Sequence, residues 1–366
     1  MKKVLILSTS TGEGHNQAAK SLESTLENNN FEVYRHDFLQ KNSKVLSTAF
    51  IGGYDFFASK FPSIYGLAYR LTDNFLSTWG LNVAYTFTRR KIKKLIDEIQ
   101  PDFIISTHPF AVPLLGSLKR KGMNIPTMSI VTDFKAHYSY YDKDIDYYIT
   151  GSEYTKIELV KLGLNEKRIY PLGIPVRDDF YLSCPELLTT KDDDYFNILL
   201  MGGSMGLNNI KYVLKELLNS KNKLRITVVC GNNKRLKESL LSEYKNKIRN
   251  KKLHILGYCS DIPSIMEYSD LLISKPGGLT VTEAFIKNLP ILIAFAIPGQ
   301  EIYNTEFLCE NDYALKVDSL LELNLMVDSL IDNPTELQKL KSNINTVSTQ
   351  YSKQKIVDLI NLNIRN

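Results

Sequence analysis

The feature that most constrains the fold is an alternation of short apolar runs with longer amphipathic stretches. In the first half, a segment with the spacing of an amphipathic helix, His15 to about Glu27, lies between apolar runs of strand length: KVLIL (3–7), FEVYRHDF (31–38), DFIIST (102–107) and PTMSIVT (126–132). Runs of this kind are typical of parallel strands that helices cover on both faces. The sequence therefore predicts an α/β fold with a parallel sheet.

The second half repeats this plan. Its strand candidates are FNILLMGG (196–203), LRITVVCG (224–231), KLHILG (252–257), DLLISK (270–275) and PILIAF (290–295). A chain of 366 residues also exceeds the length at which a single core usually stops growing. We therefore expect two Rossmann-like domains, residues 1–175 and 195–345, with a linker at 176–194 and a C-terminal helix at 346–366 that packs back on the first domain.

Composition by itself excludes few classes of protein. The net charge of +5 is mild, and apolar and charged residues, at 43% and 23%, are close to globular averages. No run of about 18 apolar residues suggests a membrane span, and the N-terminal run VLIL is too short for a signal peptide. The cysteines have no metal-type spacing and are expected to be reduced thiols in a cytosolic compartment: Cys184, Cys230, Cys259 and Cys309.

Glycine-rich loops follow two of the second-half strands. In parallel α/β sheets, ligands bind beyond the carboxyl ends of the strands. MGGSMG (201–206) would let backbone N–H groups approach a phosphate, but a tight turn without a ligand is an equal alternative. In KPGGLTVTEA (275–284), Gly277 and Gly278 permit close backbone approach, Thr280 can cap or donate, and Glu283 can accept from ribose hydroxyls or pair within the fold.

A third polar loop, PGQE (298–301), follows the last apolar run. With Asn304, its side chains Gln300 and Glu301 offer the amides and carboxylate that bind sugar hydroxyls, each of which needs a donor and an acceptor. An acidic first helical turn without a ligand is the alternative. The three loops together indicate a nucleotide-sugar site.

The order of these motifs resembles the diacylglycerol glycosyltransferases. The motifs are GEGH near the N-terminus, GIPVR (173–177), GGSMG, KPGG with TEA, and PGQE with a following Asn. This family contains the monogalactosyldiacylglycerol synthases and the processive diacylglycerol glucosyltransferases, and it is related more distantly to the peptidoglycan N-acetylglucosaminyltransferase. The resemblance implies the GT-B fold, with two Rossmann-like domains facing across a cleft, and inversion at the anomeric carbon without a metal or other cofactor.

The resemblance also assigns roles in the donor site. The glycine-rich loop and Arg177 would bind the pyrophosphate, Glu283 the ribose, and Gln300 with Glu301 the hexose. Tyr258 falls in the uracil-reading segment, with a core aromatic as the alternative. The full nucleotide-sugar set is Arg177, Gly202, Gly203, Ser204, Gly206, Tyr258, Lys275, Gly277, Gly278, Thr280, Glu283, Gln300, Glu301 and Asn304.

On the acceptor side, the family match makes His15 and Asp133 the candidates for the catalytic base. His15 opens a helix, whose dipole favours the neutral imidazole; a capping or packing histidine is the alternative. Gly14, His108 and His137 are further residues of this side. Where the family pattern TDF-x-x-H-x-x-W has a tryptophan, this chain has Tyr140. His36 and His254 are expected to be structural.

The acidic runs DKDID (142–146) and DDD (192–194) are expected to be solvated loops rather than metal ligands. Residues 45–90, in contrast, are rich in Phe, Tyr and Leu and end in a basic run. We expect them to contact an anionic membrane surface through residues such as Phe56, Phe57, Trp79, Arg89 and Arg90. Aromatic residues packed in a core of an α-helical insertion are the alternative.

These observations predict an inverting transferase, peripheral at the cytoplasmic face of the membrane, that moves glucose or galactose from a UDP-sugar to diacylglycerol to form a glycolipid. No nucleic-acid partner is expected. The alternatives are transfer to another lipid-linked acceptor of the peptidoglycan-precursor type, a UDP-sugar 2-epimerase, and a non-catalytic UDP-sugar sensor, which would not need His15 or Asp133.

Overall fold

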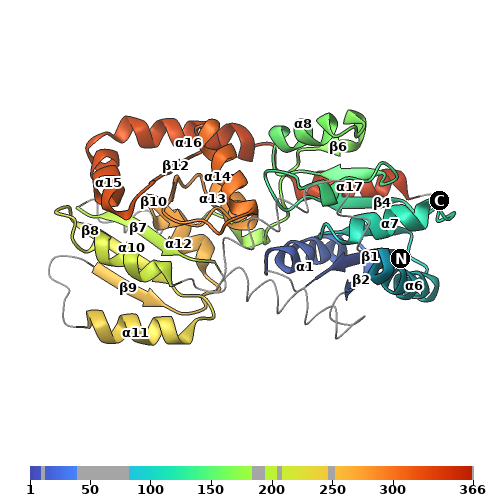
Figure 1. Cartoon of the computed structure of the whole chain (residues 1–366), viewed down its shortest axis with the longest axis horizontal. Helices are drawn as coiled ribbons and strands as arrows, with labels where there is room; N and C mark the ends of the chain where they lie inside the picture. The colour runs from blue at the N-terminus through green and yellow to red at the C-terminus, as the bar shows by residue number, and fades with distance from the viewer. Residues whose placement is uncertain (10–12, 39–81, 184–193, 204–207, 246–251, 365–366) are drawn as a thin grey trace. The chain divides into compact units, whose positions relative to one another are not determined.

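A computed structural model of the chain describes residues 1–9, 13–38, 82–183, 194–203, 208–245 and 252–364 (Figure 1). It divides into two compact units. The first comprises Met1–Arg177, Ile297–Tyr303 and Gln350–Asn366, and the second comprises Asp178–Ala296 and Asn304–Thr349. The second unit ends after residue 349 rather than at 345, because α16 (Pro334–Ser348) continues through residue 345 as one helix. The segment Ile297–Tyr303, expected in the second domain, groups with the first unit.

The first unit contains one fully parallel sheet in the order β2-β1-β3-β4-β5-β6. Its strands are β1 (Lys2–Ser8), β2 (Phe31–Asp37), β3 (Phe103–Ser106), β4 (Thr127–Ile130), β5 (Tyr147–Ile149) and β6 (Ile169–Tyr170). Its helices are α1 (Glu13–Asn28), α6 (Asn82–Ile99), α7 (Ala111–Lys119), α8 (Glu153–Lys161) and α17 (Lys353–Asn363), with short 3-10 turns η2 (Tyr138–Tyr140) and η3 (Glu166–Arg168).

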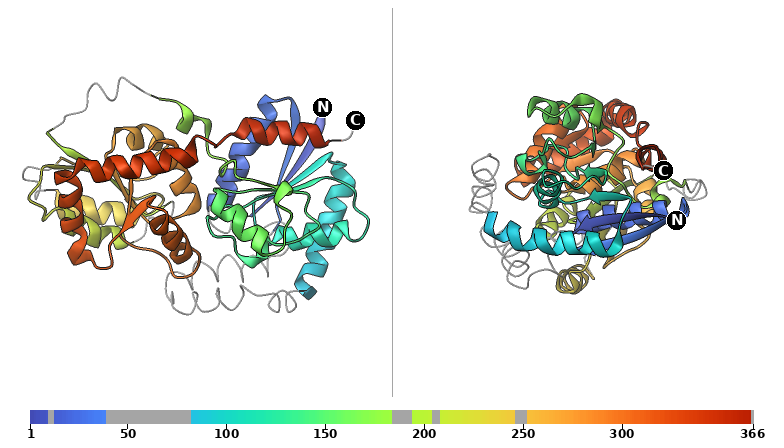
Figure 2. Two further views of the ribbon diagram at one scale, coloured as in Figure 1. Left: turned by 90° about the horizontal axis from the view of Figure 1, so that it is seen from above. Right: turned by 90° about the vertical axis from the view of Figure 1, so that its right-hand side faces the viewer.

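Helices bury both faces of this sheet, as the apolar runs predict. In β1, Val4 and Ile6 face a core shared with α1 and α17, whereas Leu5 and Leu7 face a core shared with α6 and α7. All four side chains are fully buried. The last helix, α17, therefore packs against α1 and β1 although it lies at the opposite end of the chain (Figures 1 and 2).

The second unit contains another fully parallel sheet, in the order β12-β11-β10-β7-β8-β9. Its strands are β7 (Phe196–Met201), β8 (Leu224–Val229), β9 (Lys252–Leu256), β10 (Leu271–Ser274), β11 (Ile291–Ile293) and β12 (Ala314–Lys316). Its helical segments are η4 (Asp178–Tyr181), α10 (Asn209–Leu217), α11 (Lys234–Tyr244), α12 (Ile262–Tyr268), α13 (Gly278–Ile286), α14 (Gln300–Glu310), η5 (Leu320–Glu322), α15 (Leu323–Asp332) and α16.

Strand order reverses once in each sheet, and these reversals are where doubly wound sheets bind ligands. In the first sheet the reversal lies between β1 and β3, and in the second between β7 and β10. The loops that leave these four strands begin at Thr9, Thr107, Gly202 and Lys275. Both glycine-rich motifs of the second half and the GEGH motif therefore follow strands at a reversal point.

The acidic run DKDID does not form the solvated loop that the sequence predicts. Asp142 is only 8% exposed and accepts from Arg120, which also contacts Asp144, while Asp146 pairs with Lys119. These carboxylates neutralise the basic end of α7, a partnership that sequence spacing cannot reveal. Among the described residues, no cluster of three or more His, Cys, Asp or Glu side chains is placed to hold a metal ion.

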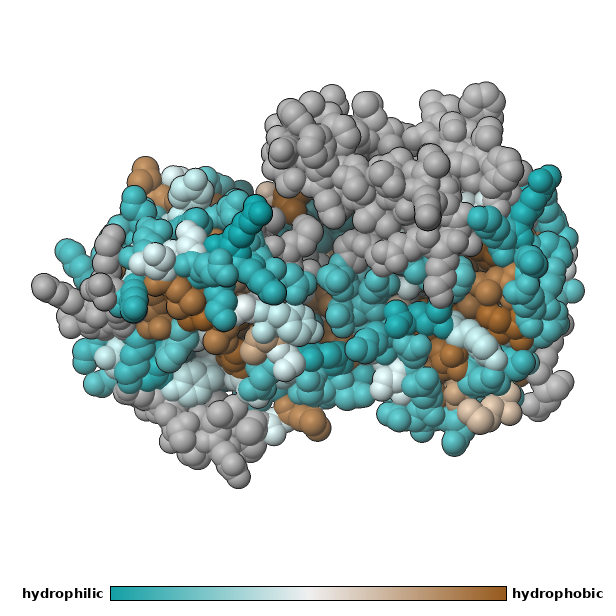
Figure 3. All heavy atoms as spheres, turned by 90° about the horizontal axis from the view of Figure 1, so that it is seen from below, coloured by the Kyte–Doolittle hydropathy of each residue, from teal (hydrophilic) through white to brown (hydrophobic). Residues whose placement is uncertain are grey.

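None of the helices in the described ranges combines the length and the apolarity needed to cross a bilayer. On the face drawn in Figure 3, the coloured apolar side chains lie in separate patches among hydrophilic ones.

Candidate functional site

Three loops of the first unit converge on His15. This residue lies in the first turn of α1, and its Nδ1 is 2.8 Å from the carbonyl oxygen of Thr107 and 2.9 Å from Oγ1 of Thr132. The ring of His108 stands edge-on to it, with 4.4 Å between ring centroids. The site is thus built by the residues that follow β1, β3 and β4.

Hydrogen bonding fixes the tautomer of His15. A backbone carbonyl can only accept, so the contact with Thr107 requires a proton on Nδ1 of His15. In the neutral ring the lone pair is then on Nε2. His15 therefore presents the nitrogen that can accept a proton from a substrate hydroxyl.

The other two histidines of this unit's candidate set have the opposite tautomer. Nδ1 of His108 accepts from the backbone N–H of Phe110, and Nδ1 of His137 accepts from the N–H of Ser139. Each neutral ring consequently carries its proton on Nε2. His137 caps the 3-10 turn η2 through this bond, and its place on the acceptor side stays a prediction.

Burial keeps both adjacent imidazoles neutral. Desolvation lowers the pKa of His15 to about 4, although its bond to the Thr107 carbonyl opposes the shift. His108 is 5% exposed, and burial together with the nearby His15 lowers its pKa well below the usual value. The neutral His15 agrees with the sequence-based expectation, but its main cause is burial rather than the helix dipole.

Asp133 is connected to His15 through other side chains. It follows β4, is 4% exposed, and its Oδ2 accepts from the hydroxyl of Tyr140 at 3.5 Å. Tyr140, which is fully buried, is also 2.9 Å from Oγ1 of Thr132. The two base candidates are therefore connected, and His15 is the one that offers an acceptor nitrogen.

In the second unit, Lys275 crosses directly over Gly203. A Cβ atom added at Gly203, where φ is +74°, would lie 2.9 Å from Cε of Lys275, and one added at Gly277 would lie 3.8 Å from its Nζ. The ammonium group is therefore held between the loops that leave β7 and β10. A cation beside two glycine-rich turns is suited to binding a diphosphate.

The amino end of α13 adds backbone donors to this place. Its N-cap is Gly277, which supplies no capping side chain, so the first N–H groups of the helix are not satisfied by a side-chain cap. Thr280 lies inside the helix and is half-buried, so it does not cap the helix, and its alternative role as a donor stays a prediction. Glu283, also half-buried, lies one turn further along α13.

Two residues of the PGQE region support loops in this structure. Asn304 is fully buried and donates from Nδ2 to the carbonyl of Pro276, so it holds the KPGG loop rather than presenting its amide to a sugar. Glu301, at 9% exposure, accepts from the backbone N–H of Ile297 and closes its own loop. Gln300 begins α14 and is half-buried.

The remaining predicted residues fall into three groups. Tyr258 is 68% exposed, which excludes the core-aromatic alternative. Gly14 precedes His15 in α1, and Arg177 ends the first unit. Arg89 and Arg90 lie on α6, where Arg89 donates to Ser117 and Arg90 is exposed. The rest lie outside the described residues: Ser204, Gly206, Phe56, Phe57 and Trp79.

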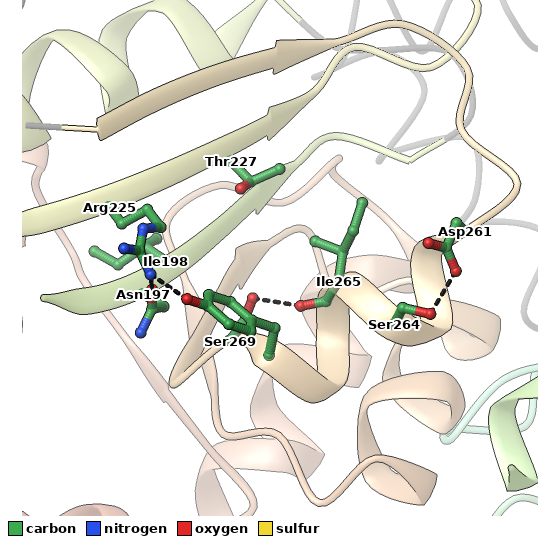
Figure 4. Close-up of a pocket in the computed structure, with 9 residues that line it drawn as sticks. Asn197, Ile198, Arg225, Thr227, Asp261, Ser264, Ile265 and Ser269 are labelled. Carbon is green, nitrogen blue, oxygen red and sulfur yellow. Dashed lines mark hydrogen bonds between the residues drawn. The ribbon is translucent and has the colours of Figure 1, made fainter. Parts of the chain in front are cut away.

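A separate cavity of about 190 Å³ lies along α12, between this helix and strands β7 and β8 (Figure 4). None of the predicted site residues lines it. Its polar groups bond one another: Arg225 donates to Asn197 and to the hydroxyl of Tyr268, and Ser264 donates to Asp261.

Sequence reasoning missed three residues of the histidine site. Thr107 and Thr132 were not singled out, and Tyr140 was noted only as a departure from a motif. Thr132 directly precedes Asp133, so its position at a strand end was the available signal. A hydrogen bond between residues 117 positions apart leaves no mark in one sequence.

Comparisons with known proteins cover nearly the whole chain. A sequence profile described as monogalactosyldiacylglycerol (MGDG) synthase matches residues 15–176, and one described as glycosyltransferase family 28 C-terminal domain matches residues 197–362. The processive diacylglycerol beta-glucosyltransferase of Bacillus subtilis (strain 168) is 31% identical over 98% of this chain and 94% of that protein. The protein of the same description from Bacillus licheniformis is 30% identical over 97% and 94%.

Similarity to solved structures identifies the fold. The crystal structure of Acinetobacter baumannii MurG matches with a TM-score of 0.70 at 17% identity, covering 99% of this chain and all of that chain (100%). The UDP-GlcNAc 2-epimerase of Neisseria meningitidis, bound to UDP-GlcNAc, matches with a TM-score of 0.62 at 13% identity, over 99% and 100%. At such identities the likeness shows the fold alone, which is that of GT-B glycosyltransferases such as MurG.

Proposed function

Since this chain belongs to the diacylglycerol glycosyltransferase family, we propose that it transfers a glucosyl group from UDP-glucose to the free hydroxyl of diacylglycerol. UDP-galactose is the second donor to test, because the two sugars differ only at the C4 hydroxyl. The observation that carries this proposal is the unprotonated Nε2 of His15, which a transferase to a hydroxyl needs and a mere sugar-binding protein does not.

The reaction is a displacement with inversion. Nε2 of His15 takes the proton of the acceptor hydroxyl, whose oxygen forms a bond to the anomeric carbon. The bond from that carbon to the β-phosphate oxygen breaks, and its electron pair leaves with UDP. His15 becomes an imidazolium and later releases the proton to water.

The second unit would hold the donor. Lys275 and the backbone N–H groups at the start of α13 are suited to the diphosphate, on which negative charge grows as the bond breaks. Glu283 would accept from the ribose hydroxyls, and the exposed Tyr258 would contact the uracil. Arg177, Gln300 and Glu301 remain proposed contacts to the diphosphate and the hexose.

We further propose that transfer needs no metal ion. A lysine ammonium contributes a full positive charge and a helix N-terminus about half of one, and together they offset the charge that a divalent cation would otherwise neutralise. The argument concerns these residues and their charges, and the assay below tests it directly.

The function is tested with purified full-length protein, UDP-[14C]glucose or UDP-[14C]galactose, and vesicles containing diacylglycerol. We expect a labelled glycolipid on thin-layer chromatography, formed equally well in excess EDTA. Labelled product from neither donor would refute the proposed function. Loss of transfer in EDTA, restored by Mg²⁺, would refute only the metal-free mechanism.

We also propose that the protein works at the cytoplasmic face of the membrane, bound peripherally to anionic lipid. The acceptor is a bilayer lipid, and α6 presents exposed Arg90, Lys91, Lys93 and Lys94 along its surface. Each basic residue near an anionic surface contributes about 1 kcal/mol. Lys93 and Lys94 are partly offset by Asp97 and Glu98. The test therefore leaves these two lysines unchanged and substitutes Arg90 and Lys91.

Flotation with phosphatidylcholine vesicles, with or without phosphatidylglycerol, tests this membrane proposal. We expect the double change Arg90→Gln and Lys91→Gln to weaken binding to the anionic vesicles by about tenfold or more. The matched control changes Lys161 and Lys339, two exposed lysines of other helices, to glutamine and should bind as the native protein does. Equal losses in both double variants would mean that the basic face of α6 has no special role.

A further inference from the structure

The hydrogen bonds around His15 extend beyond the imidazole. Oγ1 of Thr132 lies 2.9 Å from Nδ1 of His15 and 2.9 Å from the hydroxyl of Tyr140, and this hydroxyl lies 3.5 Å from Oδ2 of Asp133. Four side chains therefore form one continuous chain from an imidazole to a carboxylate. Asp133, Thr132 and Tyr140 are all buried, so water has little access to the connection.

The available donors give this series of hydrogen bonds a direction. Nδ1–H of His15 is directed at the Thr107 carbonyl and shared with Oγ1 of Thr132. The Thr132 hydroxyl can then donate to Tyr140, whose oxygen also accepts the Thr132 backbone N–H at 3.4 Å. The Tyr140 hydroxyl is left to donate to Asp133. Each hydroxyl proton is used once, and every bond points from His15 toward the carboxylate.

We infer that Thr132 and Tyr140 are positioning residues that couple the Asp133 carboxylate to His15 and stabilise the imidazolium formed when His15 accepts a proton. This inference rests on the proposed function, because it assigns a task to residues behind the base of that reaction. Asp133 then acts through Tyr140 and Thr132 and is not a second base.

The chemistry of Tyr140 suits this task. Burial and the nearby Asp133 charge raise its pKa well above the usual value, so the phenol keeps the proton that it donates. A tyrosine hydroxyl both accepts and donates, as a link in a chain must. An indole N–H can only donate, so a tryptophan at this position could not make the same connection.

The size of the coupling follows from the position of these residues. Partners that hold a metal-bound imidazole through its second nitrogen typically change metal affinity or activity by about 10- to 100-fold when they are removed, and we expect a loss of similar size behind His15. Hydrogen-bonded chains in a buried setting polarise one another, so removing any link should cost a similar amount. A variant that lacks two of these hydrogen-bonding groups should therefore have a kcat little lower than a variant that lacks one.

The test compares single and double variants of the full-length protein in the glycolipid assay. Tyr140→Phe and Thr132→Val should each lower kcat by about 10- to 100-fold with KM for the UDP-sugar unchanged, and the double variant should be no slower than the slower single one. Thr132→Ser, which keeps the hydroxyl, should restore most of the activity.

The matched control is Tyr148→Phe. Tyr148 is a second fully buried tyrosine of the same unit, and its hydroxyl donates to the carbonyl of Asp142 rather than to the histidine network. Its loss should lower the melting temperature but leave kcat unchanged. Native kcat in Tyr140→Phe, or equal impairment of Thr132→Ser and Thr132→Val, would overturn the inference.

A second measurement does not depend on turnover. In protein labelled with ring-¹⁵N histidine, the Nδ1 signal of His15, assigned with His15→Gln, should shift in Thr132→Val and Tyr140→Phe but not in Tyr148→Phe. An unmoved signal in the first two variants overturns the coupling. If the native protein forms no glycolipid, the proposed function fails, and this spectrum still decides whether the four side chains are coupled.

Discussion

Replacing His15 with glutamine should lower kcat by about 10²- to 10⁴-fold, the usual contribution of a general base. The amide can still donate to the Thr107 carbonyl, so the local structure is kept, but it offers no nitrogen that can take a proton. KM for the UDP-sugar should change little because the proposed role of His15 is to take a proton from the acceptor hydroxyl and not to bind the donor. The measurement is steady-state transfer to diacylglycerol vesicles.

The control for this variant is His254→Gln, an exposed histidine on β9. It should transfer glucose at the native rate. If His15→Gln keeps kcat within a few-fold of native, His15 is not the base, and the tautomer argument fails as a guide to the mechanism.

The same variant should change the acid stability. The pKa of His15 is about 4 in the folded protein and near the ordinary 6.5 in the unfolded chain. Between these values the unfolded chain binds more protons, so this stability is fully present above pH 6.5 and is lost as the pH falls toward 4. The loss is at most roughly 3 to 4 kcal/mol. In urea unfolding at several pH values, the free energy of unfolding of His15→Gln should fall less steeply with falling pH than that of the native protein. The decrease that remains is expected from His108.

The second large effect is expected at Lys275. Lys275→Met keeps the aliphatic stem over Gly203 but removes the charge between the two glycine-rich loops. Since removing one preorganised group that stabilises developing negative charge costs about 10²- to 10³-fold in kcat, we expect a loss of this size. The affinity for UDP should also fall, as calorimetry can measure.

Two comparisons sharpen the Lys275 result. Lys339→Met removes an exposed lysine that is paired with Asp312 on the surface. It should leave kcat and the affinity for UDP unchanged. Glu283→Gln should weaken UDP binding with a smaller effect on kcat, because a ribose contact is present before and during transfer. Native kcat and native UDP affinity in Lys275→Met would show that this ammonium does not bind the diphosphate.

Most of the sheet architecture could be predicted from the sequence. Nine strands of the described residues lie in the apolar runs named above, and burial on both faces of β1 follows from its uninterrupted Val-Leu-Ile-Leu. The strands β6 and β12, with two and three residues, are too short to produce a pattern and were not predicted.

The sites were predicted less completely. Glycine-rich loops after β7 and β10 and a histidine after β1 are local signals, and each lies at a point of strand reversal. The backbone hydrogen bonds of Asn304, Glu301 and His137 could not be predicted, because the position of each backbone group depends on the folded loop.

What the sequence determined by itself is the pair of parallel sheets and the loops that carry the chemistry, since apolar periodicity and glycine placement are local properties of the chain. Only the tertiary structure decided which nitrogen of His15 is free to accept a proton, that Lys275 crosses Gly203, and that Tyr140 and Thr132 link His15 to Asp133. A hydrogen bond is decided by distance, direction and burial, and residues far apart in the chain acquire these only when the sheet brings its strand ends together.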